Sequence, residues 1–209
     1  MIAIIDYKAG NLTSVKRALD YLGMSSEITG DAERIMNADR VIFPGVGAAG
    51  EAMDNLRKSG LDDALREFVK TGKPFLGICI GYQLLFEKSE ENGGTPCLGI
   101  LKGEVVRFTN QLSDQQQRQL KIPQMGWNSV EFSSSHPVWD NLPKDSEFYF
   151  VHAFYPEPEP GDVCAVTEYG VEYASGVAKD NLVAFQFHPE KSGRPGLQML
   201  QNFTEWENG

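Results

Sequence analysis

Short apolar runs alternate with stretches of helical periodicity over the first ninety residues. An apolar run at residues 2–6 is followed by a polar loop and then by apolar residues at helical spacing from 12 to 22. Alternating strands and helices with short loops predict a mostly parallel sheet covered on both faces, with a functional site at the carboxyl ends of its strands. The same pattern predicts further strands near 26–28, 40–43 and 75–78, and helices near 48–56, 61–70 and 82–88.

The pattern changes from about residue 104, where short alternating strands dominate. These strands are expected to be antiparallel pieces that extend or flank the parallel core. The polar, glutamine-rich segment 109–121 is expected to be an exposed loop or hairpin tip, and 156–162 (PEPEPGD) a surface turn. A last helix is expected from about 194 to 206. The expected strands are EVVRF, WNSVEF, EFYFV, VCAVTEY, VEYASGVAK and LVAFQF.

Length and charge narrow the classes of protein that fit this pattern. With 209 residues the chain can bury a sizeable core, and we expect one α/β domain spanning residues 1–209. A net charge of −10 argues against a nucleic-acid partner. No apolar run approaches a membrane span, and the N-terminus lacks the features of a signal peptide, so a cytoplasmic protein is expected. The three cysteines are widely spaced, which predicts reduced thiols and argues against a disulfide framework or a zinc cluster. No metal and no cofactor are expected.

The segment Gly77-Ile78-Cys79-Ile80-Gly81 lies where an expected strand becomes an expected helix. Glycines on either side of a nucleophile permit the tight turn that exposes it at a strand tip, with the next backbone N–H free to stabilise an oxyanion. The pattern predicts that Cys79 is a thiolate nucleophile; the alternative is a small buried hydrophobic residue. A helix N-terminus contributes only about 0.3–1 kcal/mol to thiolate formation, so a cationic partner is needed.

His188 is the histidine best placed to be that partner. It ends the apolar strand LVAFQF and is followed by Pro189 and Glu190. Residues two apart in an extended segment face the same side, so Glu190 can orient the imidazole of His188. Taken alone, His-Pro-Glu is equally compatible with a strand-end turn. His136 lies in a polar stretch and is expected to be exposed, whereas His152 fits a core position as well as a site.

The segment Pro44-Gly45-Val46-Gly47 follows a neighbouring expected strand and is placed to supply a second oxyanion donor. Glycine-rich backbone approaches a substrate closely, and loss of one such donor typically lowers a rate by roughly 100- to 1,000-fold. An ordinary strand-to-helix turn and a phosphate-binding loop are the alternatives. The second is weak because this segment contains neither GxxxxGK[ST] nor GxGxxG.

The segments GICIGYQLLFE and QFHPEKS, in this order, resemble the nucleophile and His-x-Glu motifs of class I (triad) glutamine amidotransferases. Within that class, IDYKAGNLTSVKRAL, FPGVGAAGEAMDNL, KIPQMGWN, FYFVHAFY and QFHPEKSGRPGLQMLQNF resemble the glutaminase subunits of imidazole glycerol phosphate synthase, from residue 1 to about 204. The resemblance implies a flavodoxin-like three-layer core with antiparallel strands added in the C-terminal half. It also implies release of ammonia from L-glutamine and a heterodimer with a TIM-barrel cyclase of the HisF type, for histidine biosynthesis.

The resemblance also implies residue roles. Cys79 attacks the side-chain amide of glutamine to form a thioester, His188 transfers the protons and Glu190 orients the histidine. The backbone N–H groups of Val46 and Ile80 bind the oxyanion. Substrate contacts are implied for Gly45, Gly47, Gln83, His152, Ala153 and Phe154, and contacts with the cyclase for Trp127, Tyr149 and Lys191.

Three segments differ from the motif sequences that are usual in this family. The motifs more often read CLGMQ, PHMGWN and VHSYY, where this chain has CIGYQ, PQMGWN and VHAFY. Every triad member is present, so the departures at Tyr82, Gln124 and Ala153-Phe154 bear on finer substrate contacts and on control by the partner.

Ammonia chemistry also calls for a partner, because ammonia released into neutral water is mostly protonated and lost. We therefore expect a synthase subunit to dock over the site. Glutaminase activity should be low in the isolated chain, with the PGVG segment switching on docking to complete the oxyanion hole. The alternatives are an amidotransferase subunit that feeds another acceptor, such as a nucleotide-linked sugar, a flavodoxin-like cysteine peptidase or thiol-stress protein, and a non-catalytic binding module.

Overall fold

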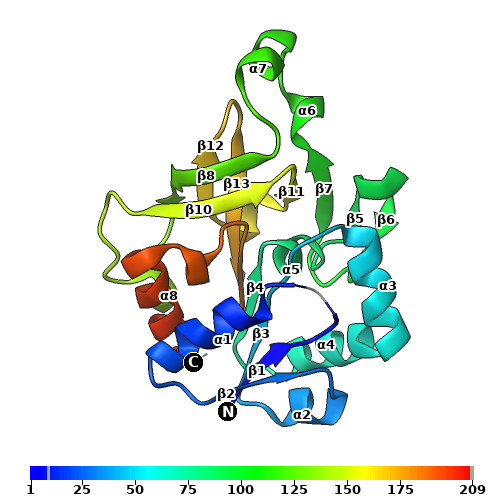
Figure 1. Cartoon of the computed structure of the whole chain (residues 1–209), viewed down its shortest axis with the longest axis vertical. Coiled ribbons are helices and arrows are strands. Elements are labelled where there is room, and N and C mark those ends of the chain that lie inside the picture. The colour runs from blue at the N-terminus through cyan, green and yellow to red at the C-terminus, as the bar shows by residue number, and fades with distance from the viewer. Residues whose placement is uncertain (9, 208–209) are drawn as a thin grey trace.

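A parallel sheet forms the lower half of the molecule in Figure 1, and the computed structural model describes residues 1–8 and 10–207. The first half of the chain alternates strands and helices, as the sequence predicts. Its elements are β1 (Ile2–Ile5), α1 (Leu12–Tyr21), β2 (Ser26–Thr29), α2 (Ala32–Asn37), β3 (Arg40–Phe43), α3 (Ala49–Ser59), α4 (Leu61–Lys70), β4 (Phe75–Ile78) and α5 (Ile80–Gln83).

The second half is mostly antiparallel and ends in a strand and a helix that return to the parallel part. Its helices are α6 (Phe108–Gln111), α7 (Asp114–Gln119) and α8 (Gly193–Glu205). Its strands are β5 (Lys88–Ser89), β6 (Thr95–Pro96), β7 (Gly103–Arg107), β8 (Gln124–Ser129), β9 (Glu131–Phe132), β10 (Glu147–His152), β11 (Phe154–Pro158), β12 (Val163–Glu168), β13 (Glu172–Lys179) and β14 (Leu182–Phe185).

Among the described residues, eight strands form the main sheet in the order β2-β1-β3-β4-β14-β13-β12-β9. The strands from β2 to β14 pair in parallel, and β13, β12 and β9 continue the sheet antiparallel. Two smaller sheets, β10-β8 and β11-β7-β5-β6, lie beside it. The predicted fold class, a mostly parallel α/β sheet with antiparallel additions, is confirmed.

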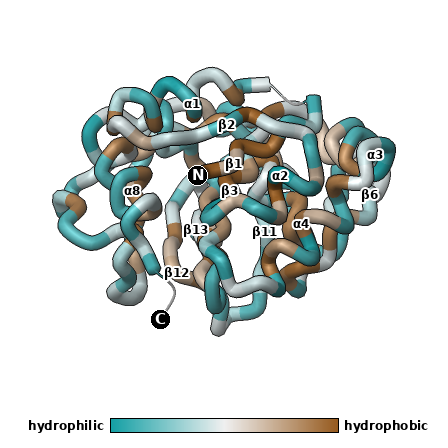
Figure 2. Tube along the Cα trace, turned by 90° about the horizontal axis from the view of Figure 1, so that it is seen from below, coloured by the Kyte–Doolittle hydropathy of each residue, from teal (hydrophilic) through white to brown (hydrophobic). Residues whose placement is uncertain are grey.

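Helices cover both faces of the parallel strands, which explains why those strands are apolar throughout. Ile2 and Ile4 of β1 belong to the core cluster that contains residues of α1 and α8, whereas Ala3 and Ile5 belong to the cluster that contains residues of α2, α3 and α4. Successive side chains of a strand point to opposite faces, so each face of β1 packs against its own helical layer. Figure 2 shows these apolar strands between the two layers of helices.

The helix expected at 82–88 is shorter than the apolar spacing indicated. The α-helix α5 ends at Gln83 because the next carbonyl groups bond to another segment. The N–H groups of Leu98, Ile100 and Gly99 donate to the carbonyl oxygens of Leu84, Leu85 and Phe86, at 2.8–2.9 Å. These tertiary hydrogen bonds take the place of helical ones.

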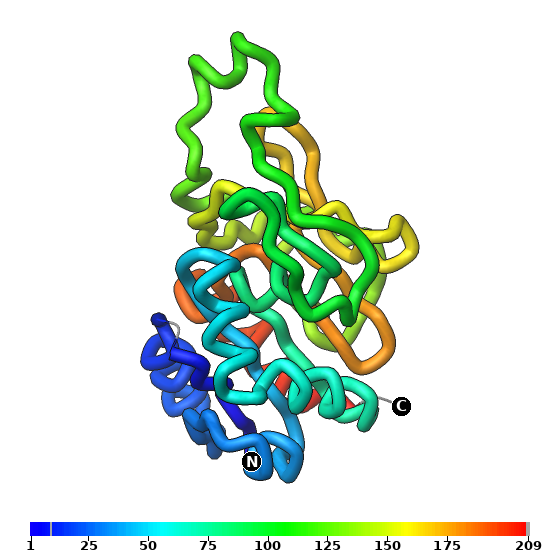
Figure 3. The backbone as a smooth tube through the Cα atoms, turned by 90° about the vertical axis from the view of Figure 1, so that its right-hand side faces the viewer, coloured from blue at the N-terminus to red at the C-terminus, as the bar shows by residue number. Residues whose placement is uncertain are grey.

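The glutamine-rich segment 109–121 is not a plain loop, which corrects the expectation from composition. It contains most of α6 and all of α7, and it projects from the rest of the molecule (Figure 3). Ser113 caps α7 in a reciprocal capping box with Gln116, a Ser-x-x-Gln signal that the sequence does contain. The turn expected at 156–162 is likewise part strand, because β11 runs through Pro158 and pairs with β7.

Candidate active site

Cys79 occupies a sharp, strained turn between β4 and α5. Its backbone has φ 55° and ψ −109°, a conformation that a non-glycine residue rarely adopts. The flanking glycines serve close packing rather than the turn itself: a Cβ on Gly81 would lie 1.8 Å from the carbonyl oxygen of Phe43, and one on Gly77 would lie 2.9 Å from Ala184 Cβ. The predicted elbow is therefore present, with the strain on the cysteine.

The main sheet brings His188 to the same place. β14 lies parallel and next to β4, and the N–H of Cys79 donates to the carbonyl of Phe185 at 2.8 Å. His188 Nδ1 lies 2.8 Å from Glu190 Oε1. Glu190 belongs to a 3₁₀ turn, Pro189–Lys191, and not to the extended segment that we expected. The turn, rather than strand alternation, brings the carboxylate back to the imidazole.

Charge coupling within this group sets the protonation of His188. Burial lowers the pKa of His188, but the neighbouring Cys79 charge and the hydrogen-bonded Glu190 carboxylate together raise it to about 10. Nδ1 faces Glu190, so the nitrogen available to the sulfur is Nε2, which is buried and has no hydrogen-bond partner among the described residues. Hydrogen bonds between catalytic groups are often long or unformed without substrate and tighten when it binds.

Asn11 is a second ligand of the buried carboxylate. Its Nδ2 donates to Glu190 Oε1 at 2.5 Å, from the left-handed residue that precedes α1. The side chain of Glu190 is fully buried, and its Oε2 has no hydrogen-bond partner in the described part of the chain. Both hydrogen bonds to the carboxylate, from Asn11 and His188, therefore converge on one oxygen.

A cavity of about 230 Å³ opens at Cys79. It is bounded by most of the residues for which the resemblance implies substrate or oxyanion contacts. Gly45 does not line it; a Cβ there would lie 1.9 Å from the Tyr7 hydroxyl, so Gly45 is packed behind the cavity wall. The lining residues are Val46, Gly47, Cys79, Ile80, Gln83, Glu91, Val151, His152, Ala153 and Phe154.

A chain of buried amides leads to the sulfur. Gln186 Nε2 lies 3.8 Å from Cys79 Sγ, and Gln186 Oε1 accepts a hydrogen bond from Gln83 Nε2 at 3.0 Å. The other N–H of Gln83 donates to the Phe154 carbonyl at 2.9 Å. Both donors of Gln83 are thus used, and its side-chain carbonyl oxygen is the group left for a ligand.

His152 is neutral and structural as well as part of the cavity wall. Burial lowers the pKa of His152 to about 3. Its Nδ1 donates to the Phe154 carbonyl at 2.8 Å, so Nε2 of the neutral ring is an acceptor, and the donor it faces is the Tyr173 hydroxyl at 3.2 Å. Gln124 Oε1 also lies 3.2 Å from Nε2 and accepts a hydrogen bond from the Tyr173 hydroxyl at 2.9 Å. Gln124, one of the residues that differ from the usual family motif, is buried beside His152 and Tyr173 and does not line the cavity at Cys79.

The residues implied at the partner surface lie together beside the site. Trp127, which is 53% exposed, contacts Tyr149 edge to face at 6.2 Å, and Lys191 Nζ lies 5.9 Å from the Tyr149 ring. The carbonyl of Tyr149 accepts the N–H of His188 at 2.9 Å, so this cluster is connected directly to the catalytic strand end.

Three residues of the site were not predicted from the sequence: Asn11, Glu91 and Gln186. Glu91 lines the cavity and its Oε2 also accepts the N–H of Ala49 at 2.6 Å. Of the three, only Gln186 had a signal, since strand alternation from His188 places it on the same face. His136 is half-buried against Trp139 rather than exposed, because the rings stack at 4.4 Å.

The described residues include no group of three or more His, Cys, Asp or Glu that could hold a metal ion. They also include no helix long and apolar enough to cross a membrane.

A strained cysteine at a strand tip, a histidine from the adjacent strand and a buried orienting carboxylate are the parts of a thiol acyl-transfer site. A family model described as glutamine amidotransferase class-I matches residues 3–206.

Relatives specify the family further. The chain is 46% identical over 207 residues to the imidazole glycerol phosphate synthase subunit HisH of Acinetobacter baylyi, covering 98% of each chain. It is 50% identical over 206 residues to the protein of the same name from Desulfovibrio desulfuricans, covering 99% and 94%. The chain belongs to the class-I glutamine amidotransferase family and, within it, to the HisH family.

Solved structures agree on the fold. A crystal structure described as a glutamine amidotransferase superposes with a TM-score of 0.73 at 21% identity, covering 98% of this chain and all of that one. PurLQS from Thermotoga maritima superposes with a TM-score of 0.71 at 17% identity, covering 98% and 97%.

Proposed function

We propose that this chain, acting as one domain in the cytoplasm, hydrolyses L-glutamine through a Cys79 thioester. The ammonia passes to a TIM-barrel cyclase subunit of the HisF type. The observation that carries the proposal is that Cys79 lines the 230 Å³ cavity while the His188–Glu190 pair follows β14, the strand next to the one that ends at Cys79. Identity of 46–50% to HisH proteins over nearly their full length supports this acceptor over the alternatives.

The first half of the reaction releases ammonia. The Cys79 thiolate attacks the side-chain amide carbon of glutamine, and the resulting oxyanion is held by the N–H groups of Ile80 and Val46. The imidazolium of His188 then gives its Nε2 proton to the amide nitrogen. The carbon–nitrogen bond breaks, ammonia leaves, and a γ-glutamyl thioester remains on the sulfur.

The second half returns the enzyme to its starting state. Neutral His188 accepts a proton from water, whose oxygen attacks the thioester carbonyl. The carbon–sulfur bond breaks and the thiolate and imidazolium are restored, while the product leaves as glutamate once its new carboxyl group has lost the second water proton to solvent. Glu190 holds Nδ1–H throughout, which keeps Nε2 directed at the reacting groups.

The cavity wall offers complementary groups for the amino-acid end of glutamine. Glu91 is the acidic residue of the lining and suits the α-ammonium group, while Gln83 offers its free carbonyl oxygen. Ala153 and Phe154 place backbone beside the substrate without hydroxyl groups of their own. Charge pairing at Glu91 thus supports selection of a free amino acid over a peptide.

The cluster of Trp127, Tyr149 and Lys191 supports a docking surface at the mouth. Met125 on the same strand is 65% exposed and Trp127 53%, which makes β8 an apolar edge beside the strand end that carries His188. A partner seated there would cover the release point of ammonia and keep it from water.

The proposal is tested by glutamate release from glutamine, measured for the isolated chain and for the chain with a HisF-type cyclase and its nucleotide acceptor. Wild type is expected to release glutamate, faster with the partner, and Cys79→Ala to release none. Burial raises the pKa of Cys97 to about 11 and raises that of Cys164 as well, so an alkylating reagent should modify Cys79 before these two thiols. Equal rates for wild type and Cys79→Ala would refute the proposal.

A further inference from the structure

The Val46–Gly47 segment is a wall between two cavities. On one side lies the glutamine cavity, and on the other lies a second cavity of about 170 Å³. Val46 and Gly47 line both. Tyr7 lines only the second, so the segment implied in oxyanion binding has open space behind it as well as in front.

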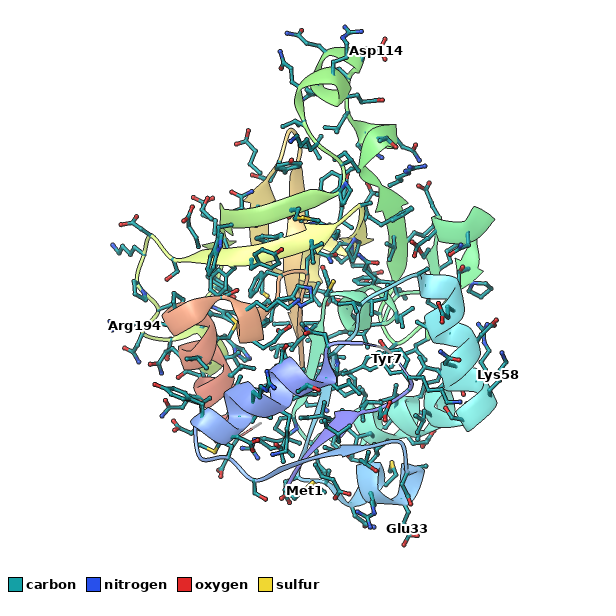
Figure 4. All side chains as sticks on the ribbon, in the orientation of Figure 1. Met1, Tyr7, Glu33, Lys58, Asp114 and Arg194 are labelled. Atoms are coloured by element: carbon teal, nitrogen blue, oxygen red, sulfur yellow. The ribbon has the colours of Figure 1, made fainter. Side chains whose placement is uncertain are left out.

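Tyr7 lies two residues beyond the end of β1, in the interior of the fold (Figure 4). The residue is 2% exposed, and its hydroxyl is buried with no hydrogen-bond partner among residues 1–8 and 10–207. Burial, aided by the nearby Cys79 charge, raises the pKa of Tyr7 far above its ordinary value, so the group remains an O–H donor. A buried donor without an acceptor is rare in folded proteins and calls for a functional explanation.

The hydroxyl lies directly against Gly45. A Cβ built on Gly45 would fall 1.9 Å from the Tyr7 oxygen and 2.3 Å from Ile80 Cγ2, so this position tolerates only glycine while Tyr7 is present. Glycine leaves the 45–46 peptide unit free to rotate, and the donor lies next to it. The carbonyl of this peptide belongs to Gly45 and its N–H to Val46.

The geometry of a trans peptide links the two sides of the wall. Its C=O and N–H point in opposite directions. Turning the Val46 N–H into the glutamine cavity therefore turns the Gly45 carbonyl away from that cavity, to the side where the Tyr7 hydroxyl lies. A donor is thus already in place behind the segment for the carbonyl that such a rotation would release.

We propose that Tyr7 is a positioning residue, whose hydroxyl donates to the Gly45 carbonyl when the Val46 N–H faces the oxyanion. In this structure the Tyr7 hydroxyl is unpaired, which corresponds to the resting conformation of the segment. Its hydrogen bond to the Gly45 carbonyl favours the active conformation, in which the Val46 N–H faces the oxyanion. This inference rests on the proposed glutaminase function and adds the residue that holds the oxyanion segment from behind. Tyr7 does not touch glutamine.

The test compares wild type with Tyr7→Phe, which keeps the ring that packs against Phe43 at 5.2 Å and removes only the donor. With the cyclase and acceptor present, kcat for glutamate release is expected to fall about threefold to tenfold, the range of one net hydrogen bond. KM for glutamine and the rate of Cys79 alkylation should match wild type. Tm should equal or exceed the wild-type value, because the resting fold loses an unpaired polar group.

Tyr82→Phe is the matched control for stability. Tyr82 is fully buried, and its hydroxyl donates to the Ala174 carbonyl at 3.2 Å, so this variant should show a lower Tm. An unchanged kcat in Tyr7→Phe, or a lower Tm accompanied by a changed KM, would overturn the role of Tyr7. A wild-type protein that releases no glutamate would instead overturn the proposed function, and this inference with it.

Discussion

The carboxylate that orients His188 depends on a donor from the opposite end of the chain, and Asn11→Asp removes that donor without changing shape. Asn11 Nδ2 now donates to Glu190 Oε1 at 2.5 Å. An aspartate offers only acceptors when ionised, so two carboxylates would face each other in a part-buried space. We expect kcat for glutamate release to fall, with little change in KM, since Asn11 does not line the glutamine cavity.

The size of the effect follows from the contacts of Glu190. Its carboxylate accepts from Asn11 and His188, both through Oε1, and Oε2 is unpaired among the described residues. A hydrogen bond to a charged group contributes about 1.5–3 kcal/mol. Each 1.4 kcal/mol is about a factor of ten, so the loss in kcat should be roughly ten- to hundredfold, with like-charge repulsion pushing it higher.

The matched control is Asn11→Gly, which removes the donor without adding a carboxylate. Glycine suits this position because Asn11 has φ 74° and its side chain makes no cap hydrogen bond to α1. Glycine accepts this conformation, whereas alanine would add about 1–2 kcal/mol of strain. Both variants are assayed for glutamate release with the cyclase present, across pH. The aspartate variant should recover partly as pH falls, because the new carboxyl group, once protonated, can again donate to Glu190. Wild-type kcat in Asn11→Asp at neutral pH would refute this role.

Three further changes probe the same site. Cys79→Ala should lower the pKa of His188 from about 10, because the Cys79 charge is the largest influence that raises it; an NMR titration of the imidazole measures the shift. Gln186→Met should slow iodoacetamide alkylation of Cys79 at pH 7 about threefold to tenfold by removing the amide 3.8 Å from the sulfur. Gly81→Ala should lower the free energy of unfolding by about 1–3 kcal/mol or more, because its Cβ meets the Phe43 carbonyl; urea unfolding beside Gly161→Ala, which meets nothing, checks this.

The sequence was most informative at the ends of the strands that precede the catalytic residues. Apolar runs before Cys79 and His188 predicted two buried strands, and the strand-tip pattern predicted the elbow. The sequence also predicted that Glu190 pairs with His188, but through an extended segment and not through the 3₁₀ turn that the structure has. Parallel pairing of β4 and β14 then explains why residues more than a hundred positions apart meet. These features are local in sequence, or follow from the rule that carboxyl ends of parallel strands share one edge.

Features decided by tertiary partners were beyond prediction. Asn11 reads as an ordinary residue before a helix, and only the packing of α1 beside the Pro189–Lys191 turn gives it Glu190 as an acceptor. Glu91 begins a three-residue 3₁₀ turn, Glu91–Gly93, which is too short for a periodic pattern to indicate where its side chain points. The early end of α5 has the same cause, since the carbonyl groups of residues 84–86, just beyond it, bond to residues 98–101, which the chain reaches only after the β5–β6 hairpin.

One charge arrangement can serve both halves of the proposed reaction. While Cys79 is a thiolate, its charge and that of Glu190 keep the buried His188 protonated, so the imidazole is ready to donate to the leaving nitrogen. Formation of the thioester removes the sulfur charge, the largest influence that raises the pKa of His188. Burial then opposes the positive charge with only Glu190 against it, so the pKa of His188 falls, and the imidazole that has given its proton to the leaving nitrogen can accept one from water. The alternation between acid and base follows from the covalent state of the sulfur, and no movement of His188 is required.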